Sequence, residues 1–403
     1  MQKKNCLVYI VCRPTEKGLK AFVFTNQFAI KKMAAAFKEV YIINLNNLKY
    51  FNNARKFNSK ILKNFKFEKN VKYFFPGNLK EFEIFVKSRK ILGLNFLGSS
   101  FSNIKILLLL KKNKIDLVQI SDVGNVQTGN RALSTEGYLH KFFKKNMHRI
   151  IVLLSNLSIL PKMEIRFITN TRLLPKNSNK TIYQKFFNKL NLGFAKKIIL
   201  INSRSFDIFK ETTLKKNKKY ITVLDEQLNN RQWTTQLGRK PFTKAQLKYH
   251  YDKLNEKLKF LSFLLKKKVV ICIHPGDDLK LKKNYFKSFK VVQYKTKEYI
   301  RKSFLVLFFE SSAIIDAILL RKKILTINSE ILDPNQKEAG LHYVRELGIP
   351  ILDIDKNNKF IKINKKLMFK KYPDYIKKYI SADNSKELGY KKVINTIKKK
   401  FFE

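Results

Sequence analysis

Residues 244–276 read KAQLKYHYDKLNEKLKFLSFLLKKKVVICIHPG and contain two kinds of apolar pattern in one stretch. Apolar residues recur every three to four positions across Lys244–Leu265, which predicts a long amphipathic helix. The short apolar run Lys268–Ile273 is typical of a buried parallel strand, and it ends in the polar turn His274–Gly276. A helix followed by a buried strand is the repeating unit of a layered α/β domain.

The same alternation extends along the whole chain, with no internal repeat and no low-complexity linker. In the second half, mostly helix is expected beyond Asp333. Further strands are expected at Tyr220–Leu224, Val291–Tyr294, Phe304–Phe309 and Lys323–Ile327, with helices at Lys297–Lys302 and Ala313–Leu320. In the first half, strands are expected at Leu7–Val11, Val40–Asn44, Ile115–Ile120, Ile150–Leu154, Arg166–Thr169 and Lys197–Ile201, with helices at Gln27–Phe37 and Tyr183–Leu192.

Two consecutive series of this kind predict an α/β protein of two facing Rossmann-like domains with parallel sheets and a C-terminal helical segment. We expect the N-terminal domain to span residues 1–210 and the C-terminal domain residues 211–403, with the joint near residues 205–219. Ligands of open parallel sheets bind beyond the carboxyl ends of the strands. The expected site is therefore a cleft between the two domains.

The charge of the chain is strongly positive. Lys plus Arg number 84 and Asp plus Glu number 30, a net charge of +54, and 71 of the basic residues are Lys against 13 Arg. A protein that reads nucleic acid uses more forked Arg and gathers it in patches. Here Lys is spread along the chain beside Asn, Ile and Phe, as an AT-rich coding sequence would produce. We expect a solvated Lys surface with some attraction to anionic membranes, and no nucleic acid partner.

The three cysteines, Cys6, Cys12 and Cys272, are scattered and form no disulfide framework, which fits a reducing compartment. The apolar start of the chain is short for a signal peptide, and Ile106–Leu110 is far below the roughly 20 residues of a spanning helix. We expect a cytoplasmic protein whose contact with the inner face of the plasma membrane, if any, is peripheral.

Polar residues follow three of the strands expected in the second half. Asp225 and Glu226 come after the first of these strands. The alternative to a ligand-binding role is an ordinary helix cap or loop carboxylate. His274 follows the next and is fixed by Pro275 and Gly276; a structural turn is its alternative. Glu310, Ser311 and Ser312 precede an apolar helix, where hydroxyls are ordinary caps but also make an anion site. A His and a Ser pair at neighbouring strand ends indicate a place for a phosphate.

Two acids of the first half, Asp122 and Glu136, are candidates for a general base. Asp122 follows the strand Ile115–Ile120 and has Gly124 nearby, whereas Glu136 lies in the loop beyond and precedes Gly137. Both have the alternative of an ordinary turn carboxylate. Phosphate-loop, dinucleotide-fold and zinc-protease motifs are absent, and the five His show no metal-ligand spacing. We therefore expect neither a cofactor nor a metal.

The run Tyr220–Glu226, the His-Pro-Gly turn and the stretch FFESSAIIDAILLRKKIL (308–325) resemble bacterial surface-carbohydrate glycosyltransferases of the GT-B type. In that family a Leu-Asp-Glu strand end, a His-Pro strand end and a Ser/Thr pair before a helix follow one another. Residues 201–207 resemble the segment that precedes the Leu-Asp-Glu strand. Related bacterial sialyltransferases carry a His-Pro motif and a Ser motif for the nucleotide of a CMP-sugar.

This resemblance covers about residues 200–330 and departs from the pattern in two places: Asn229-Asn230, and Lys322-Lys323-Ile324, which lacks a Pro. It implies a metal-independent, inverting transfer of a sialic- or Kdo-like sugar from a CMP-sugar donor to a surface glycan or lipid-linked acceptor. Asp225, Glu226, His274, Pro275, Gly276, Glu310, Ser311 and Ser312 would bind the donor, and His274 with Asp122 or Glu136 would act in catalysis. The alternatives are a CDP-alcohol polyol-phosphate transferase of cell-surface polymers and, from another class, a basic nucleic-acid-binding protein.

Overall fold

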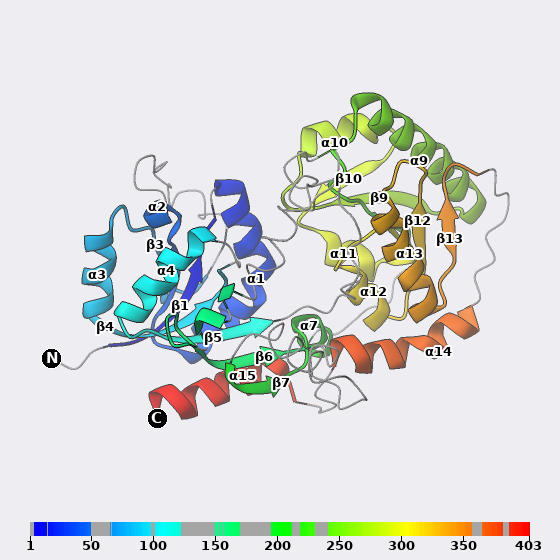
Figure 1. Ribbon diagram of the computed structural model, residues 1–403. Helices are drawn as coiled ribbons and strands as arrows, with labels where there is room; N and C mark the ends of the chain where they lie inside the picture. The colour runs from blue at the N-terminus through cyan, green and yellow to red at the C-terminus, as the bar shows by residue number, and fades with distance from the viewer. Residues whose placement is uncertain are drawn as a thin grey trace. The chain divides into compact units, whose positions relative to one another are not determined.

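The computed structural model describes residues 4–13, 15–49, 65, 67–97, 101–121, 150–151, 153–155, 157–169, 195–211, 218–229, 241–356, 365–381 and 387–403. The chain divides into two compact units. Unit 1 comprises residues 1–123, 138–207 and 381–403, and unit 2 comprises residues 124–137 and 208–380. Each unit holds one parallel sheet with helices on its faces (Figure 1).

Unit 1 contains a seven-stranded sheet in the order β3-β2-β1-β4-β5-β6-β7, with every neighbouring pair parallel. Its strands are β1 (Lys4–Val11), β2 (Val40–Asn44), β3 (Val71–Phe74), β4 (Arg89–Asn95), β5 (Asp116–Ser121), β6 (Met163–Ile168) and β7 (Ala195–Leu200). Its helical segments are α1 (Glu16–Ala36), α2 (Asn46–Lys49), α3 (Leu79–Lys87), α4 (Phe101–Lys112), α15 (Gly389–Ile397) and the π-helical turn η4 (Lys398–Phe402); α7 (Arg204–Glu211) crosses the boundary between the units.

The central strand β1 shows why unit 1 is a three-layer structure. Its odd-numbered residues from Leu7 to Val11 pack in one apolar cluster with α1 and α15. Its even-numbered residues from Cys6 to Ile10 pack in another cluster with α3 and α4. Successive side chains of a strand point to opposite faces, so a fully apolar strand requires helices on both sides.

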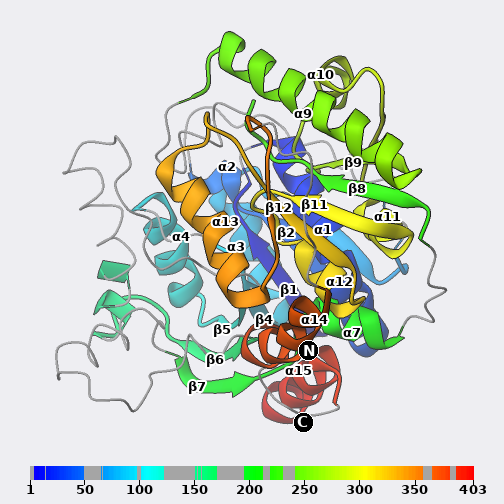
Figure 2. The same ribbon diagram turned by 90° about the vertical axis from the view of Figure 1, so that its right-hand side faces the viewer.

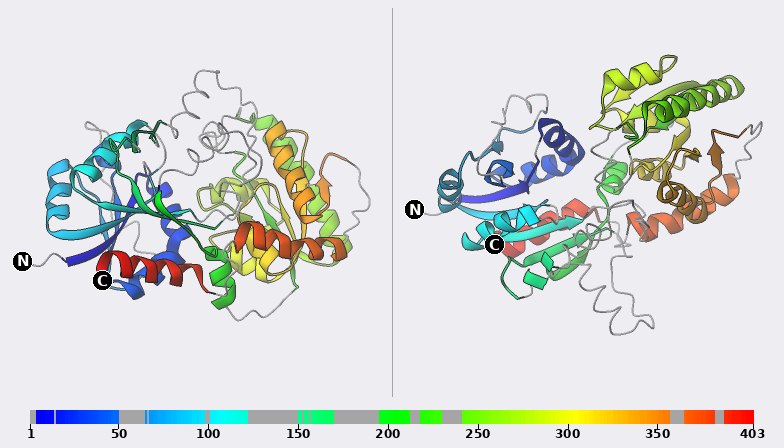
Figure 3. Two further views of the ribbon diagram at one scale, coloured as in Figure 1. Left: turned by 60° about the horizontal axis from the view of Figure 1, so that its bottom comes forward. Right: turned by 45° about the horizontal axis from the view of Figure 1, so that its top comes forward.

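The C-terminal segment belongs to unit 1, where α15 lies beside α1 (Figure 3). The buried carboxylate of Asp207 accepts hydrogen bonds of 2.8 Å from the backbone N–H groups of Gly389 and Tyr390 and so caps α15. A Cβ at Gly389 would lie 2.0 Å from the carbonyl oxygen of Asn202, so only glycine permits this contact. The sequence pattern predicts residues 381–403 in the C-terminal domain, 211–403. In the structure they belong to unit 1, because Asp207 caps α15 there.

Unit 2 contains a six-stranded parallel sheet in the order β10-β9-β8-β11-β12-β13. Its strands are β8 (Tyr220–Leu224), β9 (Lys268–Ile273), β10 (Lys290–Gln293), β11 (Ser303–Phe308), β12 (Lys323–Asn328) and β13 (Ile351–Asp353). Its helical segments are α9 (Lys244–Leu265), α10 (Leu279–Tyr285), α11 (Thr296–Arg301), α12 (Ile314–Leu319), α13 (Pro334–Leu347), α14 (Lys365–Tyr375) and η3 (Ile376–Ile380). Figure 2 shows α9 and α13 on opposite sides of this sheet.

In both sheets the first strand lies between the second and the fourth along the chain, the order of a Rossmann fold. The expected pair of parallel Rossmann-like units is therefore confirmed. The chain reverses direction beside β1 in unit 1 and beside β8 in unit 2. Such a reversal opens a crevice at the carboxyl ends of the strands, which is where ligands of this fold bind.

Some elements differ from the sequence expectations. The strand expected at Ile150–Leu154 is wrong: these residues are helical where described, because Ile151 and Leu154 pack on the core at a spacing of three while Leu153 is exposed. Three strands were not anticipated: β3, β4 and β13. The expected helix at Tyr183–Leu192 lies outside the described residues.

Candidate functional site

The ends of β8 and β9 lie next to each other at the carboxyl edge of the unit 2 sheet, and they hold His274. The ring atom Nδ1 of His274 accepts a hydrogen bond from the backbone N–H of Gly276 at 2.9 Å and lies 2.5 Å from Nε2 of Gln227. With Nδ1 occupied as an acceptor, the neutral ring carries its proton on Nε2. His274 is exposed, and these two contacts fix the orientation of its ring at this edge of the sheet.

The turn that follows His274 is held in place by the neighbouring strand β10. Nε2 of Gln293 donates to the carbonyl oxygens of His274, Pro275 and Asp277 at 3.1–3.2 Å. A Cβ at Gly276 would lie 2.9 Å from Nε2 of Gln227, so glycine lets the turn approach the end of β8. Pro275 and Gly276 thus shape the turn and orient the His274 ring.

Behind this turn lies a fully buried charge cluster centred on Lys282 of α10. Its ammonium pairs with the carboxylate of Asp225 and contacts the hydroxyl of Tyr251, and it lies 3.4 Å from Oδ2 of Asp277. It also donates to the backbone carbonyl of Glu226 at 2.9 Å. The side chains of Lys282 and Asp225 are both 0% exposed. The cluster therefore ties the end of β8 to the His274 turn and to α10.

The electrostatics of the cluster follow from burial and pairing. Burial raises the pKa of Asp225 to about 6, although the adjacent Lys282 opposes that shift. Burial lowers the pKa of Lys282, but the carboxylate of Asp225 outweighs it and the net shift is upward. At neutral pH both groups are charged, and each compensates the other. Asp225, expected from sequence to bind a ligand, is thus committed to a buried pair, while the half-buried Glu226 contributes its carbonyl oxygen.

Glu310, Ser311 and Ser312 follow β11 on the other side of β8. Oγ of Ser311 accepts from the backbone N–H of Ala313 at 3.3 Å, Glu310 and Ser311 are half-buried, and Ser312 is exposed. The expectation that His274 and the serines end neighbouring strands is wrong, because β8 lies between β9 and β11. Strands lie about 4.8 Å apart, so the two groups are separated by roughly 10 Å of sheet. The end of β8 therefore lies between His274 and the two serines.

The candidate bases cannot be placed in the same way. Asp122 and Glu136 lie outside the described residues, although Ser121, directly before Asp122, ends β5.

A polar group that sequence reasoning missed is Arg13, which follows β1 at the reversal point of the unit 1 sheet. The carbonyl oxygen and N–H of Arg13 bond the side chain of Asn44 at 3.0 and 2.8 Å, and its guanidinium lies 5.6 Å from the ring of Phe22.

Sequence reasoning also missed Gln227, Asp277 and Lys282. Oδ1 of Asp277 accepts from the N–H of Asp278 at 3.0 Å and from Nδ2 of Asn229 at 3.3 Å, and its N–H donates to the carbonyl of His274 at 2.9 Å. Gln227 and Asp277 each lie within three residues of a predicted site residue, so closer attention to those turns would have found them. Lys282 gives no such signal, because it is one lysine among several in α10.

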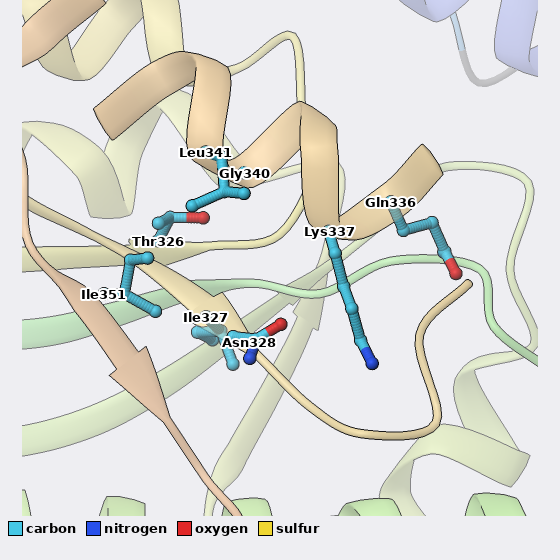
Figure 4. A pocket seen from close by; sticks show the side chains of 8 residues that line it. All are labelled: Thr326, Ile327, Asn328, Gln336, Lys337, Gly340, Leu341 and Ile351. Carbon is cyan, nitrogen blue, oxygen red and sulfur yellow. The ribbon is translucent and has the colours of Figure 1, made fainter. Parts of the chain in front are cut away.

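A separate cavity of about 160 Å³ lies between β12, β13 and α13 (Figure 4). Thr326, Asn328, Gln336, Lys337, Gly340 and Ile351 are among its lining residues. Oγ1 of Thr326 and Nε2 of Gln336 are buried there without a hydrogen-bond partner in the described part of unit 2. Pockets for whole ligands usually enclose about 300–1,000 Å³, so this cavity is too small for a nucleotide-sugar and does not replace the β8–β9–β11 edge.

The described residues hold neither a group of metal-ligating side chains nor a membrane-spanning helix. Across these segments, no group of three or more His, Cys, Asp or Glu side chains is arranged to hold a metal ion. None of the helices in the described ranges combines the length and apolar character needed to cross a lipid bilayer.

Comparisons with known proteins give a fold relation. No protein-family model matches the chain, and no curated protein sequence matches it. Among solved structures, a variant of the wall teichoic acid polymerase TagF is similar over 100% of this chain and 90% of its own, with a TM-score of 0.50 and 11% identity. The fold is GT-B-like. The UDP-GlcNAc 2-epimerase of Methanocaldococcus jannaschii in complex with UDP-GlcNAc and UDP covers 98% of this chain and 99% of its own, at a TM-score of 0.46 and 11% identity. MurG of Acinetobacter baumannii covers the same shares at a TM-score of 0.42 and 9% identity.

Proposed function

We propose that this protein is a glycosyltransferase that binds a nucleotide-sugar donor at the carboxyl edge of the unit 2 sheet. The observation that carries the proposal is the orientation of His274, whose Nδ1 is held by Gln227 and Gly276 so that the ring N–H is on Nε2. A ring N–H positioned in advance at a strand end suits a phosphate oxygen that gains charge as a bond to it breaks.

The chemistry follows from that placement. An acceptor hydroxyl attacks the anomeric carbon of the donor, the bond from that carbon to the phosphate oxygen breaks, and the nucleotide leaves. Nε2–H of the neutral His274 ring donates to the leaving phosphate. Ser311 and Ser312 supply hydroxyl donors from the far side of β8. Because these groups are in place before the reaction, they stabilise the charge without reorganising.

The acceptor proton requires a base, for which we propose Asp122, with Glu136 as the alternative. A base acts on the acceptor alone, so replacing it by its amide spares donor binding and collapses the transfer rate. The proposed acceptor is a surface glycan or a lipid-linked oligosaccharide. Full transfer activity in both Asp122→Asn and Glu136→Gln would place the base elsewhere.

For the donor we propose a CMP-sugar that carries a sialic- or Kdo-like acid, on the motif resemblance of residues 220–226, 274–276 and 308–325. A second candidate is a polyol-phosphate transferase that expels CMP from a CDP-alcohol. The observation that favours it is the fold shared with TagF, which is named as a wall teichoic acid polymerase. Both candidates use the same phosphate site, and they differ in whether the bond that breaks is to the sugar or within the diphosphate.

A donor screen with the purified full chain tests the proposal. CMP-sugars, UDP- and GDP-sugars and CDP-glycerol are offered in turn, and release of the nucleotide is measured. We expect turnover with one donor class, reduced about 10²–10³-fold in His274→Ala, as for removal of one charge-stabilising donor. The matched control is His342→Ala on α13, which should keep full activity. No turnover with any donor, or equal turnover in both variants, would contradict the proposal.

A further inference from the structure

The amino edge of the unit 2 sheet, opposite the candidate site, is lined with basic residues. Each of the strands β8 to β12 begins with a lysine or follows one within three residues. We call these residues the basic edge: Lys218, Lys219, Lys266, Lys267, Lys268, Lys287, Lys290, Lys302, Arg321 and Lys323. A strand of five or six residues spans about 17–20 Å, so the basic edge is well separated from the carboxyl edge of its own sheet.

Several of these lysines are crowded together without acidic partners. The ammonium of Lys323 lies 3.8 Å and that of Lys267 5.8 Å from the ring centre of Phe304. Burial lowers the pKa of Lys323 to about 8, and the positive charges of Lys365 and Lys218 add to that shift. No described acidic side chain pairs with Lys218, Lys323 or Lys365. Uncompensated charges held this closely attract anions.

Exposed apolar side chains lie beside this charge, at the last turns of α9. Phe260 is 44% exposed, Phe263 is 84% exposed and Leu264 is 50% exposed. Their spacing of three and four residues places them on one side of the helix. The helix ends at Leu265, and Lys266–Lys268 lead directly into β9, so this apolar patch adjoins the basic edge.

Other positive groups of the same edge have protein partners. Lys302 forms an ion pair of 2.7 Å with Glu298, and the buried Lys322 donates to the carbonyl oxygens of Arg301 and Ser303 at 2.6 and 2.8 Å. Within the described residues, Lys302 is thus the one member of the basic edge with an ion pair, whereas Lys323 and Lys267 lie against the ring of Phe304.

We propose that the basic edge and the apolar patch Phe260, Phe263 and Leu264 form a docking surface for an anionic lipid bilayer. Lysines attract the headgroups, and the three apolar side chains enter the boundary between headgroups and acyl chains. The basic edge holds one arginine, Arg321, among its ten residues, which favours lipid over nucleic acid because forked Arg binds nucleic-acid phosphates. The exposed aliphatic Leu264 beside the two phenylalanines suits an acyl-chain boundary and offers bases nothing to stack on. This proposal does not depend on the proposed function.

Vesicle co-sedimentation of the full chain tests the proposal. The vesicles contain either phosphatidylcholine alone or phosphatidylcholine with phosphatidylglycerol. The edge variant is Lys218→Gln/Lys268→Gln/Lys323→Gln, and the charge-matched control is Lys80→Gln/Lys87→Gln/Lys283→Gln. We expect binding to the anionic vesicles that weakens as salt rises, with affinity about 100-fold lower in the edge variant and within about threefold of the wild type in the control.

A second pair of variants tests insertion. Phe263→Ser should lower vesicle affinity about tenfold, because insertion of the apolar ring is lost. Ile84→Ser, which changes an apolar side chain on α3 that is 60% exposed, should leave the affinity unchanged. Equal losses in the edge variant and its control would overturn the proposal in favour of unspecific charge. Tighter binding of an oligonucleotide than of anionic vesicles, lost in the same edge variant, would overturn it in favour of nucleic acid.

Discussion

The two edges of the unit 2 sheet carry opposite kinds of side chain. Basic residues precede the strands β8 to β12, whereas acids follow most of them. Those at the carboxyl edge are Asp225, Glu226, Asp277, Asp278, Glu310, Glu330, Asp333, Asp353 and Asp355. A lysine-rich composition alone would not produce such a difference within one sheet. This difference is the basis on which we propose separate tasks for the two edges, a polar ligand site at one and contact with an anionic surface at the other.

Each edge also buries one lysine, and the two are held differently. Lys282 at the carboxyl edge is compensated by a buried carboxylate, whereas Lys322 at the amino edge donates to backbone carbonyl oxygens. Removing the first leaves a buried charge behind, and removing the second takes a donor away from two neutral carbonyl oxygens. At the carboxyl edge, stability therefore depends on the balance of buried charges. At the amino edge it depends on hydrogen bonds to backbone carbonyl oxygens.

The largest effect is expected from Lys282→Met. The substitution leaves the fully buried Asp225 without its cation, and breaking a buried pair in this way costs about 3–5 kcal/mol of unfolding free energy. Urea denaturation of the purified variant measures the loss. The exposed neighbour in Lys283→Met should change stability by less than about 0.5 kcal/mol.

A double variant sharpens this prediction. Lys282→Met/Asp225→Leu removes both charges and should recover part of the lost stability, because no unpaired charge is left in the interior. If the single variant were as stable as the wild type, the cluster would not hold the carboxyl edge together, and the comparison of the edges would lose its basis.

A smaller loss is expected at the amino edge. Lys322→Met leaves the carbonyl oxygens of Arg301 and Ser303 without this donor, which costs about 1–3 kcal/mol. The same urea titration compares it with Lys282→Met. A loss equal to that of Lys282→Met would show that the two buried lysines are equivalent, contrary to the account.

The smallest expected effect is a pH dependence of the unfolding free energy that arises from His250 of α9. His250 is buried against Tyr251 and Phe309, and burial, aided by the charge of Lys282, lowers its pKa to about 3. The unfolded chain takes up a proton on this ring near pH 6.5 while the folded chain does not, so the stability that His250 contributes is lost as the pH drops below about 6.5. The slope from this one proton is about 1.4 kcal/mol per pH unit. Asp225, whose pKa burial raises to about 6, contributes in the opposite direction below pH 6.

Unfolding measured from pH 7 to pH 5 checks this dependence. His250→Phe keeps an aromatic ring but cannot titrate, so it should lose less stability than the wild type between pH 7 and pH 5. Identical slopes in the two proteins would contradict the low pKa of His250.

Sequence patterns predicted unit 2 better than unit 1, for physical reasons. β8, α9 and β9 have the bounds expected, because a long amphipathic helix between two short apolar strands has few other solutions. Ile150–Leu154 was misread because a short apolar run is compatible with either a strand or a helix. The cap of α15 by Asp207 joins residues 182 positions apart, and no local sequence pattern predicts such a contact.

The candidate site was predicted in part. His274, Pro275 and Gly276 lie where their turn was expected, and their position after a buried strand was the signal. Asp225 was expected to face a ligand, but it pairs with Lys282, a partner hidden in a lysine-rich helix. Local sequence patterns also do not predict the order of strands in a sheet, and only the assembled sheet shows β8 between β9 and β11.

Hydrogen exchange of the full chain, with and without nucleotide, tests the central claim most directly. CMP, CDP, UDP and GDP are added in turn, and peptides covering residues 272–279 and 308–314 are compared with peptides covering residues 264–270 and 319–325. The account predicts that one nucleotide slows exchange at the first pair, on the carboxyl edge, and that His274→Ala weakens this protection. Protection confined to the second pair, on the amino edge, would contradict it.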